Sequence, residues 1–158
     1  LYFYRPDHPQ HGFLCNWSPS PFIDPLLPFH TFPHNEQYMM YHKAVLCAPT
    51  HPILQKILDE RDPRTCKKHG REVPNWDDSA WAKVRYKTVR RGLWFKFSQN
   101  ERLRRKLLAT GERDLVEAAP KDRVWGVGFN VDRAGAHRGQ WGMNLLGKAL
   151  MDVRRELR

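Results

Sequence analysis

The sequence has few cysteines and no long hydrophobic run. Its three cysteines, Cys15, Cys47 and Cys66, have no paired spacing, which argues against a disulfide framework and favours a reducing, intracellular compartment. No apolar run approaches the roughly 18 residues that a membrane span needs, so we expect no membrane contact. The first residue is Leu1 rather than methionine, and nothing is therefore concluded from the lack of a signal peptide.

Positive charge and aromatic side chains are plentiful instead. The chain has 27 Lys and Arg against 17 Asp and Glu, a formal net charge of +10. This surplus favours anionic partners such as phosphates or nucleic acid, although it also serves solubility alone. With 158 residues, 41% hydrophobic and 12% aromatic, the chain has enough apolar material for one packed core. We therefore predict a single domain over residues 1–158.

The residue pattern predicts a mainly helical α+β domain with a few short strands. The segment 6–33 holds seven of the 12 prolines and many aromatic residues, and we expect it to form an ordered loop on the core. Asn35, Thr50 and either Asp77 or Asp78 are suited to begin helices. The expected helices span residues 35–47, 50–59, 77–97, 100–109 and 144–157, and the expected strands span 1–4, 115–118 and 123–127.

Glu36 and Lys43 form the most suggestive pair of charged residues. They are seven positions apart, so on a helix they project within about 20° of each other and about 10.5 Å apart along the axis. This separation is too long for the usual ion pair between neighbouring helical turns. The two side chains are therefore suited to bind opposite ends of one small chemical group of a ligand. The alternative is that they are unrelated polar positions on a partly exposed helix.

A glycine-rich segment lies near the end of the chain. Six of the ten glycines fall between Gly126 and Gly147, among aromatic residues that include Trp125. Such a segment lets backbone amides approach a phosphate while an aromatic ring stacks on a base or ribose. The alternative is a flexible hairpin before the last helix. Trp125, close to Asp122, is the tryptophan that this pattern favours as a ligand contact, whereas Trp76, Trp81 and Trp94 by themselves suggest core positions.

Familiar cofactor motifs are incomplete. The pattern Gly126-x-Gly128 is not continued, because position 131 is Val, and the near P-loop before Lys148 has Ala149 where Ser or Thr would bind magnesium. Cys66-x-x-His69 lacks a second pair of zinc ligands. We therefore expect neither a cofactor nor a metal. The basic stretches 83–91 and 102–106 suit solvated helix faces or, alternatively, a footprint for a phosphate backbone.

A set of short motifs follows one another along almost the whole chain. The motifs are Gly12-Phe-Leu-Cys-Asn-Trp17, Asn35-Glu-Gln-Tyr-Met-Met-Tyr-His-Lys43, Gly70-Arg71, Asn75-Trp76, Leu115-Val-Glu117, Asp122 to Gly126, and Asn144-Leu-Leu-Gly-Lys-Ala-Leu150. Taken in this order, they resemble the NADAR family, also called YbiA-like. The sequence departs from the family pattern at Cys15, where Ser is more usual, and at the Pro-rich insert from Pro25 to Pro28.

The resemblance implies an N-glycosidase that hydrolyses the bond between a ribose carbon and an exocyclic amine. Its leading form is a hydrolase that removes ADP-ribose from the amino group of guanine in DNA, in RNA or in free ADP-ribosylated guanosine, opposite a partner ADP-ribosyltransferase. The first alternative is cleavage of ribosylamino-pyrimidine phosphate intermediates of riboflavin biosynthesis. The second is an ADP-ribose-binding module without turnover. The net charge of +10 favours the polyanionic substrate.

For the chemistry, we expect Lys43 to attack or polarise the anomeric carbon, which requires a partly buried amine of lowered pKa. Glu36 is then the general acid or base, and Asp122 is a reserve carboxylate suited to ribose hydroxyls. The resemblance implies a set of substrate-binding residues, namely Asn16, Trp17, Tyr38, Arg71, Trp76, Trp125, Gly126, Gly128, Asn144 and Gly147.

Overall fold

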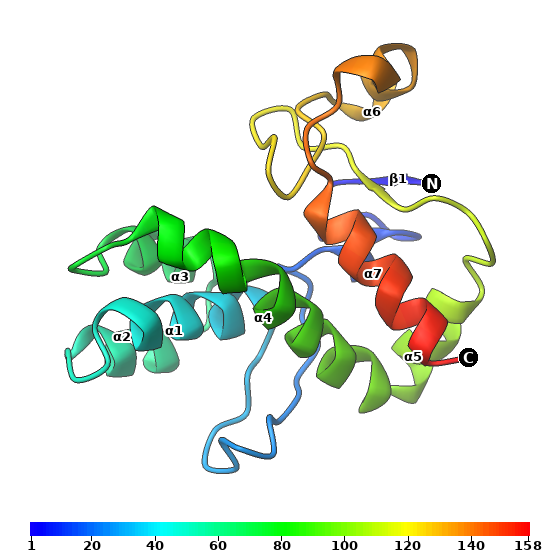
Figure 1. Ribbon diagram of the computed structural model, residues 1–158. Coiled ribbons are helices and arrows are strands. Elements are labelled where there is room, and N and C mark those ends of the chain that lie inside the picture. Colours follow the sequence, from blue (N-terminus) through cyan, green and yellow to red (C-terminus); the bar gives the residue numbers. More distant parts are fainter.

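Helix α1 (Asn35–Cys47) is the centre of the fold in the computed structural model, which describes all residues 1–158. Helices α2 (Ile53–Asp59), α3 (Pro63–Arg71) and α4 (Asp78–Ser98) pack against it. Figure 1 shows α1, α2 and α3 gathered on one side, with α4 running across the molecule towards α5 (Glu101–Leu108) and α7 (Leu145–Glu156). The mainly helical domain predicted from the sequence is confirmed.

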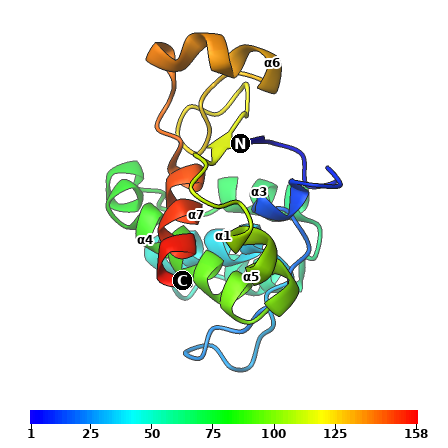
Figure 2. The same cartoon turned by 90° about the vertical axis from the view of Figure 1, so that its right-hand side faces the viewer.

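The remaining elements are short. Strands β1 (Tyr2–Phe3) and β2 (Val116–Glu117) pair in parallel, with Tyr2 opposite Val116. Two 3-10 turns, Gly12–Leu14 and Gly135–Gln140, and helix α6 (Val131–Ala134) complete the chain. Figure 2 shows the lobe that contains α6 projecting beyond the end of α7. No helix has both the length and the apolar character to cross a membrane.

The starts of two helices differ from the prediction. His34 caps α1, because its Nδ1 accepts a hydrogen bond from the backbone N–H of Gln37 at 3.1 Å. Asn35 is fully buried and its side-chain amide donates to Asn16 and to the Val89 carbonyl instead. Helix α2 begins after Pro52 rather than at Thr50. At the start of α2, His51 Nδ1 accepts the backbone N–H of Ile53 at 3.0 Å, so at both helix starts a histidine ring, rather than the expected Asn or Thr side chain, accepts a backbone N–H.

The predicted strand over 123–127 is wrong. This segment is a series of turns: Asp122 Oδ1 accepts the backbone N–H groups of Val124 and Trp125, both at 2.8 Å. The carbonyls of Arg123 and Trp125 in turn accept backbone N–H groups from the start of α7 and the residues before it. The loop after β2 is therefore held firmly against α7, which fixes the position of Asp122.

The core has one large part and two small ones. The large part joins α1, α4 and α7 through residues such as Met40, Leu93 and Leu150, all at 2% exposure or less. Phe22 and Phe32 of the Pro-rich segment form a second cluster with Tyr38. This packing confirms that the segment 6–33 lies on the core, and it leaves one side of α1 free to line a cavity.

Candidate functional site

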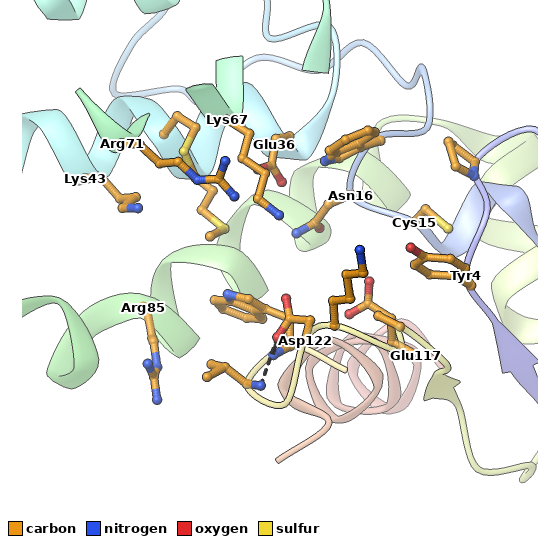
Figure 3. A pocket seen from close by; sticks show the side chains of 18 of the residues that line it. Tyr4, Cys15, Asn16, Glu36, Lys43, Lys67, Arg71, Arg85, Glu117 and Asp122 are labelled. Atoms are coloured by element: carbon orange, nitrogen blue, oxygen red, sulfur yellow. Dashed lines mark hydrogen bonds between the residues drawn. The ribbon is translucent and has the colours of Figure 1, made fainter. Parts of the chain in front are cut away.

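A pocket of about 810 Å³ lies between the helical body and the loop after β2. Its walls come from the β1 segment, from α1, α3 and α4, and from residues 117–125 (Figure 3). Ligand sites in proteins typically occupy about 300–1,000 Å³. The pocket therefore has the size of a site for a nucleotide-like molecule.

Glu36 and Lys43, on one face of α1, both line this pocket. Glu36 is 5% exposed, and burial raises its pKa to about 7, although Lys67 and Lys43 oppose the shift. Burial lowers the pKa of Lys43, while the charges of Glu36 and Asp78 act in the other direction. The spacing thus places an acid that titrates near neutrality and a partly desolvated amine in one cavity.

Two tryptophans surround the Lys43 amine. Its Nζ lies 4.4 Å from the ring centroid of Trp76 and 5.8 Å from that of Trp81. Both rings line the pocket. The sequence pattern by itself suggested a core position for Trp76, and the structure places it at the pocket instead. It is 40% exposed, which leaves part of its surface available to a ligand.

Two carboxyl groups form the side of the pocket opposite α1. Asp122 is held by the turn described above, and Glu117 stands at the end of β2. Burial raises the pKa of Glu117 to about 8, with further contributions from the charges of Asp122 and Glu36. Glu117 was not among the predicted site residues. Its signal in the sequence is an acidic residue that directly follows the buried residues Leu115 and Val116.

Unpaired cations line the same pocket. None of them forms a salt bridge with a carboxylate of the protein. Arg71 and Lys121 are exposed, whereas Glu36 is deeply buried. The site therefore combines acidic groups in its interior with cations that are free to bind an anion. The five unpaired cations are Lys43, Lys67, Arg71, Arg85 and Lys121, and a sixth cation of the lining, Arg5, pairs with Asp7.

The structure brings most of the predicted site residues together. The eight that line the pocket are Asn16, Trp17, Glu36, Lys43, Arg71, Trp76, Asp122 and Trp125. The five that do not are Tyr38, Gly126, Gly128, Asn144 and Gly147.

Tyr38 is fully buried and donates its hydroxyl hydrogen bond to Asp24 at 2.8 Å. It follows Glu36 by two residues, so on α1 it projects about 200° further round the helix. It therefore packs with Phe22 and Phe32 on the side away from the pocket. The expectation that Tyr38 binds substrate is corrected on this ground.

The expected ligand contacts of Asn144 and the three glycines are also corrected, because these residues join α7 to β2 and its loop. The side chain of Asn144 accepts a hydrogen bond from the Glu117 N–H and donates one to the Leu115 carbonyl. A Cβ on Gly147 would collide with that same carbonyl. A Cβ on Gly126 would lie 2.8 Å from the Glu117 carbonyl, and Gly128 has a φ of +79°.

No group of three or more His, Cys, Asp and Glu side chains is arranged to hold a metal ion. The acidic groups of the pocket instead stand among lysines and arginines. The arrangement is suited to holding an anionic ligand while a lysine and a buried carboxyl group meet its reactive atoms.

Comparison with known proteins gives a consistent family. The NADAR domain matches residues 2–158. An N-glycosidase of Acanthamoeba polyphaga mimivirus is 36% identical over 99% of this chain and 95% of its own length. A riboflavin biosynthesis protein of Vibrio vulnificus is 33% identical over 99% of this chain, which spans only 38% of that protein.

The fold comparison agrees with the sequence comparison. The solution structure of Escherichia coli YbiA superposes with a TM-score of 0.79 and 27% identity, and the match covers 99% of this chain and 83% of YbiA. The expectation of a YbiA-like fold is confirmed. The chain is thus homologous to YbiA-like N-glycosidases over nearly its whole length, and it belongs to the NADAR family.

Proposed function

We propose that this protein is an N-glycosidase that removes ADP-ribose from the amino group of guanine in nucleic acid. The observation that carries the proposal is the placement of buried Glu36 and partly desolvated Lys43 in one pocket with unpaired cations. The names of relatives, among them the mimivirus N-glycosidase, support the reaction type.

The substrate class is supported by size and charge. A volume of about 810 Å³ lies in the upper part of the usual range for ligand sites, which suits a molecule as large as ADP-ribose. The unpaired cations Lys67, Arg71 and Lys121 suit its diphosphate. Exposed aromatic surface on Trp76 suits a stacked base. The net charge of +10 favours a nucleic-acid carrier over a small metabolite.

In the proposed reaction, the ribose ring opens to an imine between its anomeric carbon and the guanine nitrogen. Nζ of Lys43 adds to that carbon, a proton passes from Nζ to the guanine nitrogen, and the bond between carbon and guanine nitrogen breaks. An imine with Lys43 remains, and water hydrolyses it, which restores the amine and releases ADP-ribose. The Glu36 carboxyl group carries this proton from Nζ to the guanine nitrogen, because its pKa of about 7 suits both gain and loss of a proton.

A direct displacement by water is the alternative route at the same site. In that case Glu36 stabilises a positively charged ribosyl transition state or activates the water, as carboxylates do in glycoside hydrolysis. Lys43 then acts through its charge alone. The two routes differ in whether a bond to the lysine forms.

The decisive experiment is incubation of an oligonucleotide ADP-ribosylated on guanine with the wild type and with Lys43→Ala and Glu36→Ala. Mass spectrometry is expected to show release of ADP-ribose by the wild type and its loss in both variants. Lys148→Ala, an exposed change outside the pocket, is the matched control and should retain activity. An oligonucleotide left intact by the wild type would contradict the proposal.

A second candidate is the cleavage of ribosylamino-pyrimidine phosphates. The name of the Vibrio vulnificus relative favours it, and its substrate offers the same type of bond and a phosphate. Turnover of such a phosphate, with the oligonucleotide left intact, would replace the first substrate by the second. Tight binding of ADP-ribose without any product would instead favour a binding module.

A further inference from the structure

Two carboxyl side chains stand next to each other on one wall of the pocket. Glu117 comes from the end of β2 and Asp122 from the loop that follows it, and Figure 3 shows them side by side. Gly126 lies against both backbones: a Cβ there would meet the Glu117 carbonyl at 2.8 Å and the Asp122 carbonyl at 3.0 Å. The close packing of these backbone segments therefore fixes the two residues next to each other.

Both residues are held rigidly. The Glu117 N–H donates to Asn144 at 3.0 Å, and its carbonyl accepts from the Val127 N–H at 2.9 Å. The Oδ1 atom of Asp122 accepts two backbone N–H groups, from Val124 and Trp125. The Oδ2 atom of Asp122 has no hydrogen-bond partner in the protein and is therefore a free acceptor at the pocket wall.

Glu117 differs from Asp122 in the hydrogen bond that it can make to a ligand. Its Oε2 is buried and has no hydrogen-bond partner, and an ionised oxygen in that position would be costly, because neither water nor a donor solvates it. The groups that face it are Asp122 on the loop, Glu36 on α1, Lys67 on α3 and the Cys15 thiol. Burial, with a further contribution from two acids against one lysine, raises the pKa of Glu117 to about 8. At neutral pH it is therefore a hydrogen-bond donor.

A neutral acid beside a free carboxylate oxygen suits a hydroxyl pair. One hydroxyl accepts from the acid, and the other donates to the carboxylate, as the two adjacent hydroxyls of a ribose can do. A phosphate does not fit this wall, since it would face Asp122 and Glu36, whereas unpaired cations are available elsewhere in the pocket.

We propose that Glu117 and Asp122 form a subsite for the adjacent hydroxyls of a ribose, with Glu117 as donor and Asp122 as acceptor. The inference rests on the proposed function only in that the substrate carries a ribose, which both candidate substrates do. Glu117 is then a residue that selects ribose over deoxyribose.

The test compares the binding of two probes, methyl riboside 5-phosphate and its 2-deoxy counterpart. The blocked anomeric carbon of each prevents any reaction with Lys43. The wild type is expected to bind the ribose probe about tenfold more tightly, the effect of one hydrogen bond. Glu117→Ala should bring the two affinities to within a factor of two, whereas Glu117→Gln, which can still donate, should keep the preference.

The pH dependence separates binding from a merely structural role. As the pH rises from 6 to 9, the preference of the wild type should change, because Glu117 loses its proton near pH 8 and turns from a donor to the hydroxyl into an acceptor from it. Glu117→Gln should keep a constant preference, since an amide does not ionise in this range. Glu101→Gln, on exposed α5 outside the pocket, is the control, and the thermal midpoint of each variant shows whether it is folded.

Three outcomes would overturn the inference: equal binding of both probes by the wild type, a preference that survives in Glu117→Ala, or no binding of either probe. These outcomes are independent of the hydrolysis assay. Hydrolysis without ribose preference removes the subsite and leaves the proposed function standing. Ribose preference without hydrolysis does the reverse.

Discussion

At the scale of single residues, Lys43 has the properties that amine nucleophiles require. Burial lowers the pKa of Lys43, while the charges of Glu36 and Asp78 act in the other direction, so the neutral amine costs less here than in a solvated lysine. The flat ring of Trp76 at 4.4 Å limits where Nζ can move. The structure thus favours the neutral amine relative to a free lysine and restricts the direction from which it can approach a ligand.

The first prediction follows from this position. Borohydride added during turnover should link the ADP-ribose unit covalently to Lys43, because reduction of the imine makes the bond permanent. Lys43→Ala and Lys43→Arg should both lower kcat by a factor of about 10² or more, and neither should be labelled. Intact-mass and peptide-mass measurements check this. Full activity of Lys43→Arg would exclude the covalent route.

The second prediction concerns Glu36 and stability. Its pKa is about 7 in the folded protein against about 4.3 in an unfolded chain, so the folded state binds the proton more tightly. The free energy of unfolding that this group contributes is therefore greatest at low pH and declines between about pH 4 and 7. Glu36→Gln should be more stable relative to the wild type at pH 8 than at pH 5.

Urea unfolding of both proteins at the two pH values measures this difference. Burial lowers the pKa values of buried His34 and half-buried His42. These histidines act in the opposite direction, but they are present in both proteins, so their effects cancel. The shift in the thermal midpoint should be about 2–4 °C for each kcal/mol. An equal difference at both pH values would contradict the raised pKa of Glu36.

The candidate site could be predicted from the sequence only in part. The spacing of Glu36 and Lys43 predicted one shared helix face, because a single helix fixes their geometry, but it left open whether that face lines a pocket, as it does. Glu117 was missed, since its role depends on the meeting of β2 with α1 and α3, which local spacing does not encode. Tyr38 was misplaced because a position in a motif does not reveal which face of the helix is buried.

At the scale of elements, helices with clear caps were predictable. Asp77 caps α4 through the Ala80 N–H at 2.9 Å, as the sequence suggested. Helix α3 was missed, because only Cys66, His69 and Gly70 of its nine residues are buried, and they give no apolar stripe. Its signal was Asp62 followed by Pro63, a cap and a first-turn proline. Short α6, with four residues, has no periodicity to detect.

The third prediction tests the structural role of the contact between α7 and β2. Gly147→Ala should destabilise the protein by roughly 1–3 kcal/mol or more, because its Cβ would collide with the Leu115 carbonyl and the Asn144 side chain. Gly139→Ala is the matched control, since nothing lies within 4 Å of a Cβ there. Thermal unfolding measures both. A stable Gly147→Ala that has lost only substrate binding would restore the ligand role first assigned to Gly147.

At the scale of the whole molecule, the positive charge is divided into two kinds. Several arginines are engaged in the fold: Arg91 pairs with buried Asp24, and Arg90 pairs with Glu156. The pocket cations, such as Lys67 and Arg85, have no such carboxylate partner. Their charge is therefore available to a ligand. The pocket also holds the carboxyl groups of Glu36, Asp78, Glu117 and Asp122, and exposed cations such as Arg102 lie outside it, so only part of the net charge of +10 can serve the pocket.

The fourth prediction uses the unpaired pocket cations to test whether the protein contacts a nucleic-acid strand or only the ADP-ribosylated nucleoside. If the substrate is a strand, phosphates beyond the ADP-ribose should contact Arg85, the pocket cation that is assigned neither to the diphosphate nor to the reaction. Each such contact with a single strand adds about 0.7 to the slope of log affinity against log salt. KM for the oligonucleotide should thus rise more steeply with salt than KM for free ADP-ribosylated guanosine.

Arg85→Gln should flatten the slope for the oligonucleotide and leave the slope for the free nucleoside form nearly unchanged. Arg102→Gln, an exposed cation on α5 outside the pocket, should alter neither slope. Steady-state kinetics between about 50 and 300 mM salt provides the measurement, because salt screens such contacts over roughly this range. Equal slopes for both substrates would mean that the protein reads only the ADP-ribosylated nucleoside, because a strand that contacts the pocket cations must release counterions when it binds.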